Sequence, residues 1–200
     1  MGGAGPVVDA PSKYLARLPN QFEGAENLRA LIRVAALLFE ESNEILIGEF
    51  GSLTGTTATF GTSTKNGVDL AIEQINAAGG VLGRKIKFIQ EDGASDWPTF
   101  AEKAKKLLVN DKCAAVMGCW TSASRKAVLP VFEQYNGMLY YPTFYEGLEQ
   151  SKNVIYTGQE ATQQILAGLD WVVKEKKAKK FFLVGSDYIW PRTSNKIARK

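Results

Sequence analysis

The sequence predicts an α/β fold in which helices cover both faces of a parallel sheet. From residue 45 onward, short apolar runs alternate with segments of helical periodicity. That alternation is typical of parallel sheets, whose strands are buried on both faces and joined by helical crossovers. Signals for helix starts and stops stand between the runs, which supports the same prediction. We expect every crossover to be right-handed.

Six short apolar runs are the expected strands of this sheet. They cover residues 45–50, 85–92, 114–120, 138–142, 153–158 and 180–186. Between them, apolar residues recur at the three- and four-residue spacing of a helix that buries one face. The expected helices cover residues 62–78, 98–110, 123–136 and 161–176.

Residues that break or cap helices agree with these boundaries. The glycine pair in NAAGG at 76–80 can supply the positive φ that ends a helix. Asp96 is expected to cap the next helix, with Pro98 in its first turn and Thr99 and Glu102 at capping-box spacing. Pro130 is expected to kink the third helix or to limit its regular part.

The composition excludes several functional classes. The 200 residues include 24 basic and 21 acidic side chains, a balance that does not indicate a nucleic-acid partner. There is no histidine, which excludes His-dependent triads and His metal ligands. No apolar run approaches the ~20 residues of a membrane span. The N-terminal MGGAGPVVDAP has no cationic start, so we expect no signal peptide and, for the chain as written, a cytoplasmic location.

The two cysteines do not indicate a catalytic centre. Cys113 and Cys119 flank one apolar run, where we expect both to be buried thiols. Cys119 is a conceivable nucleophile, but no local pattern places a base beside it. We therefore expect no enzyme activity, no catalytic residue, no metal site and no cofactor.

Hydroxyl and aromatic side chains follow several of the expected strands. Open parallel sheets bind ligands at the carboxyl ends of their strands, and a small polar ligand needs hydrogen-bonding groups enclosed by apolar walls. The strand ends are poor in charge, with Asp187 and Arg125 as the main exceptions, and we expect Arg125 to face solvent or to pair with an acid. The pattern favours a small neutral ligand, although ordinary caps and loop aromatics would give the same residues. The candidates are Trp120, Thr121, Ser122, Tyr141, Thr143, Tyr188 and Trp190.

Six segments resemble one known family. They are SLTGT (52–56), AIEQINAAGGVLGRKI (71–86), EDGASDWPTFAEKAKKLL (91–108), GCWTSASRKAVLPVFEQYNG (118–137), YPTFYEGLEQSKNVIYTG (141–158) and FLVGSDYIWPRTSNKI (182–197). Together they look like the urea and short-chain amide substrate-binding proteins of ABC transporters, which are of the branched-chain amino-acid-binding type. The resemblance extends over residues 45–200.

The resemblance implies a two-lobed clamshell that binds its ligand between the lobes and presents it to an ABC permease outside the cytoplasm. The first lobe would be residues 45–157, and residues 158–200 would begin an incomplete second lobe. By resemblance, Ser122 and Thr143 would hydrogen-bond the amide, and Thr121 would lie beside them. The side chains of Trp120 and Tyr141 would form the walls of the pocket. Tyr188 and Trp190 would form part of its lid. With half of the cleft missing, we expect weak binding or none.

Several alternatives stay open. Thr143-Phe144 partly resembles the YPTPYEG segment of the related cytoplasmic amide sensors, so both the ligand and a sensor function are undecided. An amide hydrolase that uses Cys119 and a folded module without a ligand are two further hypotheses. Residues 1–44 match nothing in the family. Within them, residues 25–42 are expected to form a helix that covers apolar surface elsewhere in the chain.

Overall fold

The computed structural model describes residues 44–200, which belong to one compact unit, Asn43–Lys200. The expected leader and the helix predicted for 25–42 lie outside the described residues. Within the described part, no helix is both long and apolar enough to cross a membrane.

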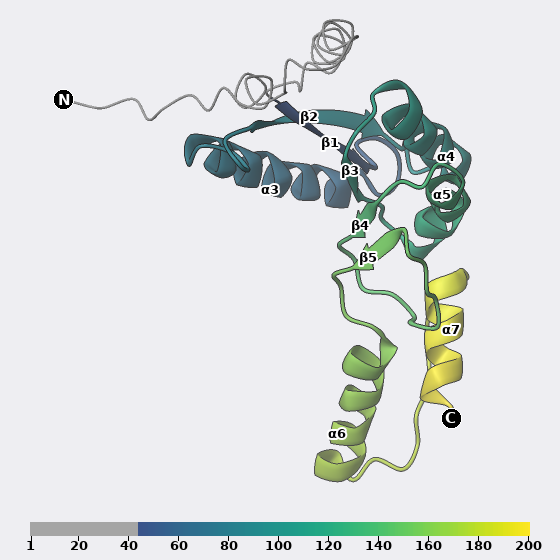
Figure 1. Cartoon of the computed structure of the whole chain (residues 1–200). Helices are drawn as coiled ribbons and strands as arrows, with labels where there is room; N and C mark the ends of the chain where they lie inside the picture. Colours follow the sequence, from purple (N-terminus) through teal and green to yellow (C-terminus); the bar gives the residue numbers. More distant parts are fainter. Residues whose placement is uncertain (1–43) are drawn as a thin grey trace, which may run out of the picture. The chain divides into compact units, whose positions relative to one another are not determined.

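The described chain is built on a five-stranded parallel sheet, as predicted (Figure 1). The strand order is β2-β1-β3-β4-β5, with β1 in the interior of the sheet. β1 pairs with β2 along the full length of both strands, Glu44 facing Lys85 and Gly51 facing Asp92. The strands span Glu44–Gly51 (β1), Lys85–Asp92 (β2), Ala115–Gly118 (β3), Leu139–Tyr141 (β4) and Val154–Tyr156 (β5).

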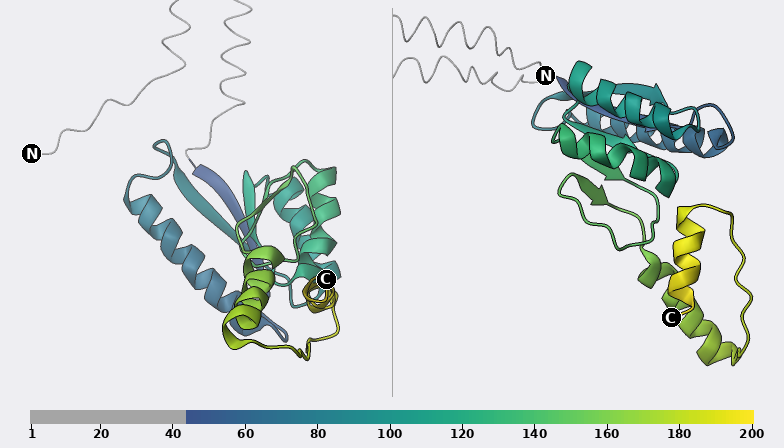
Figure 2. Two further views of the ribbon diagram at one scale, coloured as in Figure 1. Left: turned by 90° about the horizontal axis from the view of Figure 1, so that it is seen from below. Right: turned by 90° about the vertical axis from the view of Figure 1, so that its right-hand side faces the viewer.

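The helices lie close to the predicted positions, and the connections between them can be followed in Figure 2. Two of the helical segments include a wider, π-helical turn, η1 after α4 and η2 before α6. The segments are α3 (Ala58–Ala77), α4 (Trp97–Lys105), η1 (Lys106–Asn110), α5 (Ser122–Gln134), η2 (Thr162–Leu166), α6 (Ala167–Lys176) and α7 (Ile189–Ala198).

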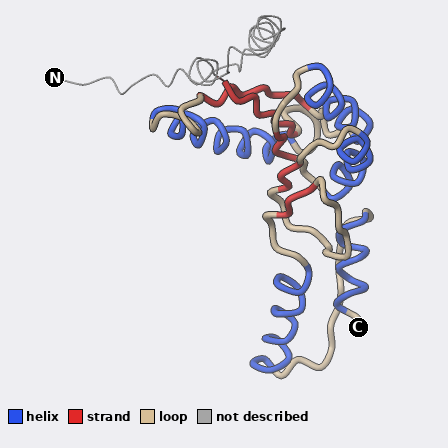
Figure 3. Tube along the Cα trace, viewed as in Figure 1, coloured by secondary structure: helices blue, strands red, loops and turns tan. Residues whose placement is uncertain are grey.

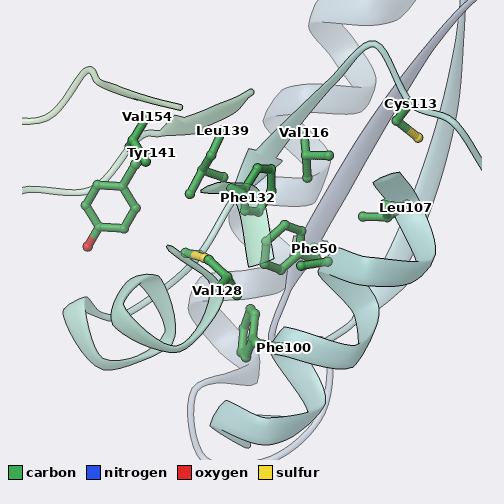
Figure 4. Close-up of a cluster of buried hydrophobic side chains, with 12 residues drawn as sticks. Phe50, Phe100, Leu107, Cys113, Val116, Val128, Phe132, Leu139, Tyr141 and Val154 are labelled. Atoms are coloured by element: carbon green, nitrogen blue, oxygen red, sulfur yellow. The ribbon is translucent and has the colours of Figure 1, made fainter. Parts of the chain in front are cut away.

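The main core lies between the sheet and helices α4 and α5 (Figure 4). Strand side chains alternate between the two faces of the sheet, so Phe50, Val116 and Leu139 share this face and are fully buried. The Phe50 ring lies 5.5 Å from Phe100 of α4 and 6.3 Å from Phe132 of α5, measured between ring centroids. The core thus fixes the carboxyl ends of β1 and β3 relative to the start of α5.

The opposite face of the sheet is covered by α3, which contacts β1 and β2. Beyond α3, the side chains of Tyr140 in β4 and Ile155 in β5 are 39% and 42% exposed. An apolar hollow of about 680 Å³ lies between α3 and this face, with Ile47 and Met117 in its lining. Helices therefore flank both faces, as predicted, but the second face is only partly covered.

Most of the predicted helix signals act as expected. Asp96 is the N-cap of α4 and accepts a hydrogen bond from the Thr99 amide at 3.0 Å. The predicted capping box of Thr99 and Glu102 was wrong. It requires Thr99 to be the N-cap, but α4 begins at Trp97, so Thr99 lies inside the first turn. α3 ends just before Gly79 and Gly80, whose φ values are +110° and +82°. α5 continues four residues past Pro130, to Gln134.

The sixth predicted strand was wrong. Residues 180–186 carry no strand, and no strand is found between 157 and 200 (Figure 3). Phe182 is 92% exposed and Val184 is 79% exposed. A strand exists only when a neighbouring strand supplies hydrogen-bond partners for its backbone, and none of the described residues does so here. An apolar pattern alone therefore does not make this segment a strand.

Candidate functional site

The loop after β1 is fixed by side chains that follow β2. Asp92 Oδ1 accepts a hydrogen bond from the Leu53 amide at 2.8 Å, and Asp92 Oδ2 accepts one from the Thr54 hydroxyl at 2.6 Å. Ser95 bonds the Thr57 amide and donates to the Thr54 carbonyl. Burial acts to raise the pKa of Asp92, but these hydrogen bonds outweigh it and hold the pKa below its ordinary value. The loop therefore has one defined conformation at the edge of the sheet.

Three of the predicted ligand residues lie on two neighbouring loops. Trp120 and Thr121 follow β3, where Thr121 is the N-cap of α5 and accepts a hydrogen bond from the Ala123 amide at 3.2 Å. Thr143 follows β4 and donates to the Cys119 carbonyl at 3.2 Å, which joins the two loops. All three predicted residues are half-buried.

The hydroxyls of these two threonines are left with different hydrogen-bonding capacities. The Thr143 hydroxyl hydrogen is used by the Cys119 carbonyl, so its oxygen is left only to accept. The Thr121 oxygen accepts from one backbone amide, so its hydrogen is left to donate and one lone pair is left to accept. The edge of the sheet thus offers a donor on one loop and an acceptor on the adjacent loop.

A row of aromatic rings connects this edge to α7. Phe60, in the first turn of α3, stacks on Trp120 with ring centroids 4.6 Å apart. Phe144 lies 6.1 Å from Trp120 and 4.9 Å from Trp190, edge to face in both cases. The row therefore brings together Trp120 and Trp190, two predicted residues 70 positions apart in the sequence. Phe60 and Phe144 are not among the predicted ligand residues, although both lie in segments that follow strands.

Ser122 and Tyr141 lie in a buried polar cluster around Arg125. The Tyr141 side chain is fully buried and Ser122 is 3% exposed. Arg125 Nη1 donates to Ser122 Oγ at 3.2 Å, and the guanidinium carbon lies 4.8 Å from the Tyr141 ring centroid. Tyr141 donates its hydroxyl hydrogen to the Phe144 carbonyl at 3.4 Å. In the described chain, these two predicted ligand residues are therefore buried against Arg125 and pack under the loops that follow β3 and β4.

The charge of Arg125 is balanced by two acids. Nη2 donates to Glu146 Oε2 and Nε donates to Glu149 Oε1, each at 2.8 Å. Burial acts to lower the pKa of Arg125, but the two carboxylates outweigh it and raise the pKa. Burial raises the pKa of Tyr141 to about 12. The prediction for Arg125 is confirmed in its second alternative, since Arg125 pairs with acids and does not face solvent. The two acids lie in the YEGLE segment (145–149) and were not predicted as its partners.

Tyr188 and Trp190 stand at the start of α7, where Tyr188 is the N-cap. Both residues are half-buried. They line a hollow of about 320 Å³ together with residues of α6 and the 183–186 segment. The Trp190 indole nitrogen is buried there without a hydrogen-bond partner among the described residues. Tyr188 and Trp190 thus lie on a different element from the other candidates, and the contact of Trp190 with Phe144 connects the two groups.

Cys119 is not suited to nucleophilic chemistry. It is 3% exposed, and burial raises its pKa, so the thiol is protonated at neutral pH. Both cysteines are buried free thiols, as predicted. Among residues 44–200, no group of three or more Cys, Asp or Glu side chains could hold a metal ion.

The five-stranded parallel sheet with helices on both faces has the open α/β architecture in which ligands bind at the carboxyl edge of the sheet. Residues 45–200 match the family described as "Periplasmic binding protein domain". The chain belongs to this family.

The relatives by sequence are amino-acid-binding proteins. An "Amino acid binding protein" of Pseudomonas aeruginosa is 32% identical over 145 residues, which cover 70% of this chain and 38% of the relative. The "Leu/Ile/Val-binding protein homolog 3" of Brucella melitensis is 32% identical over 147 residues, covering 70% of this chain and 39% of the relative. This chain therefore matches well under half the length of these two relatives. Their names describe binding, not catalysis.

Solved structures share the fold. The branched-chain amino acid transporter substrate-binding protein LivJ of Streptococcus pneumoniae, in complex with isoleucine, has a TM-score of 0.68 and 25% identity, covering 78% of this chain and 46% of that one. A solute-binding protein of Rhodopseudomonas palustris, in complex with 3,4-dihydroxybenzoic acid, has a TM-score of 0.71 and 24% identity, covering 78% and 43%. Both support the α/β lobe seen here.

Proposed function

We propose that this chain carries the first lobe, residues 45–157, and the beginning of the second lobe, from residue 158, of a substrate-binding protein for ABC-type uptake. The family match supports this proposal. In such a protein, ligand binding is non-covalent, and a membrane permease is the partner that receives the ligand. The relatives' family is periplasmic, which gives the proposed location.

We further propose that the ligand is urea or a short-chain aliphatic amide. The observation that carries this proposal is the pair of threonine hydroxyls, with a free donor on Thr121 and a free acceptor on Thr143. An amide offers the complementary carbonyl oxygen and N–H group, and each such bond contributes about 1 kcal/mol. The nearby guanidinium of Arg125 is already neutralised by two carboxylates, so no positive charge is left for a ligand carboxylate.

A branched-chain amino acid is the second candidate ligand. It is favoured by the names of the relatives, which include Leu/Ile/Val-binding proteins. The carboxylate and ammonium groups of an amino acid could also use one donor and one acceptor. The two candidates differ in charge, so a ligand panel separates them. The cytoplasmic amide sensor stays a prediction, with no specific observation in its favour.

The test is isothermal titration calorimetry of the 200-residue chain with urea, acetamide, formamide, isoleucine and 4-hydroxybenzoate. We expect weak binding of the neutral amides, with Kd on the order of 1 mM or above, and no heat from the charged ligands. Thr143→Val removes the acceptor at nearly constant volume and should weaken amide binding about fivefold, the equivalent of about 1 kcal/mol.

Thr157→Val is the matched control, because the Thr157 hydroxyl also donates to a backbone carbonyl, that of Tyr141, at 3.1 Å. It should leave the amide affinity unchanged. Tighter binding of isoleucine than of acetamide would reject the amide class and keep the family function. Equal losses in both Thr→Val variants would reject Thr143 as a ligand contact.

A further inference from the structure

A second hollow, of about 310 Å³, shares no residue with the predicted ligand site. It lies between the loop after β4, the first helical turn after Ala161 and the last turn of α7. Its polar lining includes two carboxylates and a hydroxyl, and its apolar lining includes three aliphatic side chains. These are Glu146, Glu160 and Thr162, and Leu148, Leu166 and Ile197.

One carboxylate in this hollow has an unused acceptor. Glu146 is 4% exposed, and its Oε2 accepts the hydrogen bond from Arg125. Its Oε1 is buried and has no hydrogen-bond partner among the described residues. Leaving a charged acceptor buried and unpaired is costly, and such groups are normally satisfied. A donor is therefore missing at this position.

The second carboxylate is held in place by the helix that it caps. The Glu160 carboxylate accepts hydrogen bonds from the Gln163 backbone amide at 3.1 Å and from the Thr162 hydroxyl at 3.0 Å. In return, the Glu160 backbone amide donates to Gln163 Oε1 at 3.0 Å. Gly147 lies against it, with φ of +71°, and a β-carbon there would stand 3.1 Å from Glu160 Oε2. The glycine next to Glu146 thus lets Glu160 approach the same loop.

No cation of the described chain pairs with Glu160, and Arg125 alone pairs with Glu146. Lys200 also lines the hollow, but no ion pair joins its ammonium to either carboxylate. Ca²⁺ and Mg²⁺ prefer six or more oxygen ligands, which two carboxylates and one hydroxyl between aliphatic walls do not supply. An ammonium group has three donors and suits a site with few acceptors.

We propose that this hollow binds a small primary alkylammonium ion. The ammonium group donates to Glu146 Oε1 and to the Glu160 carboxylate. The alkyl chain lies against Leu148 and Leu166, which are 91% and 39% exposed without it. The site is separate from the proposed amide site and does not depend on it.

The test is calorimetric titration of the full 200-residue chain with butylammonium chloride at constant ionic strength, beside 1-butanol and sodium butyrate. We expect saturable binding of butylammonium with Kd on the order of 1 mM, the range open to a ligand of five heavy atoms. The neutral and anionic analogues should not bind. Glu160→Gln, which keeps a hydrogen-bonding side chain at the cap, should weaken binding about tenfold or more.

Glu102→Gln, an exposed acid on α4, is the matched control and should leave the affinity unchanged. Leu166→Trp fills the hollow without replacing any residue of the Arg125 cluster and should abolish binding, so the proposal does not depend on a Glu146 variant that fails to fold. Binding of butanol as tight as that of butylammonium, an unchanged Kd in Glu160→Gln, or no saturable binding would each overturn the proposal.

Discussion

The two regions of the described chain, residues 44–157 and 158–200, share one sequence pattern and differ in structure. In the first, each apolar run pairs with a neighbouring strand, and Phe50, Phe100 and Phe132 are completely buried. In the second, the run at 180–186 has no partner strand, and α6 has no buried residue. The difference shows that a local pattern becomes a strand only where another strand completes its hydrogen bonds.

The charged residues of the two regions differ in the same way. Arg125 is fully buried between two carboxylates, whereas Arg192 pairs with Asp187 at the surface, where the side chains are 64% and 83% exposed. A buried charge is costly to leave unpaired, while an exposed pair contributes little. Four predictions sharpen or break this comparison, beginning with the largest expected effect.

Arg125→Ala should lower the free energy of unfolding by about 3–5 kcal/mol, because it leaves the buried Glu146 carboxylate without its ion-pair partner and leaves Glu149 with Lys126 alone. Arg192→Ala should lower it by less than about 1 kcal/mol. Guanidinium chloride denaturation measures both, since urea is a candidate ligand. Similar losses in the two variants would contradict the contrast between the regions.

Phe100→Ala should lower the free energy of unfolding by about 3–4 kcal/mol, because it empties part of the core between α4 and the sheet. Phe182→Ala removes the same ring at a site that is 92% exposed and should change stability by less than about 0.5 kcal/mol. The same denaturation experiment compares them. A large loss at Phe182 would mean that this segment is packed in solution.

Ionisation of Glu49 should lower the free energy of unfolding as the pH rises from 4.5 through 6. Its side chain is fully buried, with one oxygen bonded by Gln90 at 2.8 Å, and burial raises its pKa to about 6. A carboxyl whose pKa is raised on folding stabilises the fold while protonated and loses that contribution on ionising. A pKa raised from 4.5 to about 6 corresponds to about 2 kcal/mol of stability.

Glu49→Gln should therefore gain about 2 kcal/mol relative to the original chain between pH 4 and pH 7.5, from denaturation curves at both values. Asp69→Asn, an acid on the facing α3 that also acts on Glu49, is the control and should show a smaller change. A constant difference between Glu49→Gln and the original chain at both pH values would reject the raised pKa.

The smallest effects concern the helix caps. Asp96→Ala should lower the free energy of unfolding by about 1 kcal/mol. Because α4 is packed into the core, destabilising this helix destabilises the whole fold. Glu160→Ala should leave global stability within about 0.5 kcal/mol and instead speed amide hydrogen exchange in residues 161–166, because local opening there costs less. Equal global losses would indicate that the two regions unfold together.

Most of the secondary structure of the first region, residues 44–157, could be predicted from the sequence. Five of the six predicted strands and all four predicted helices are present, because buried strands and amphipathic helices have strong local patterns. It also found Asp96 as a cap and both cysteines as buried thiols. The loop contacts of Asp92 and the two carboxylates around Arg125 were missed, since each joins residues more than 20 positions apart.

The sequence by itself determined the fold class, the order of the elements and the polar and aromatic character of the strand ends. These follow from periodicity and from capping residues, which act within a few positions. Only the tertiary structure decided that Ser122 and Tyr141 are buried around Arg125, that Phe144 connects Trp120 to Trp190, and that 180–186 is not a strand. Those outcomes depend on which distant segments come together, and burial, ion pairing and strand pairing all require a partner that local sequence does not specify.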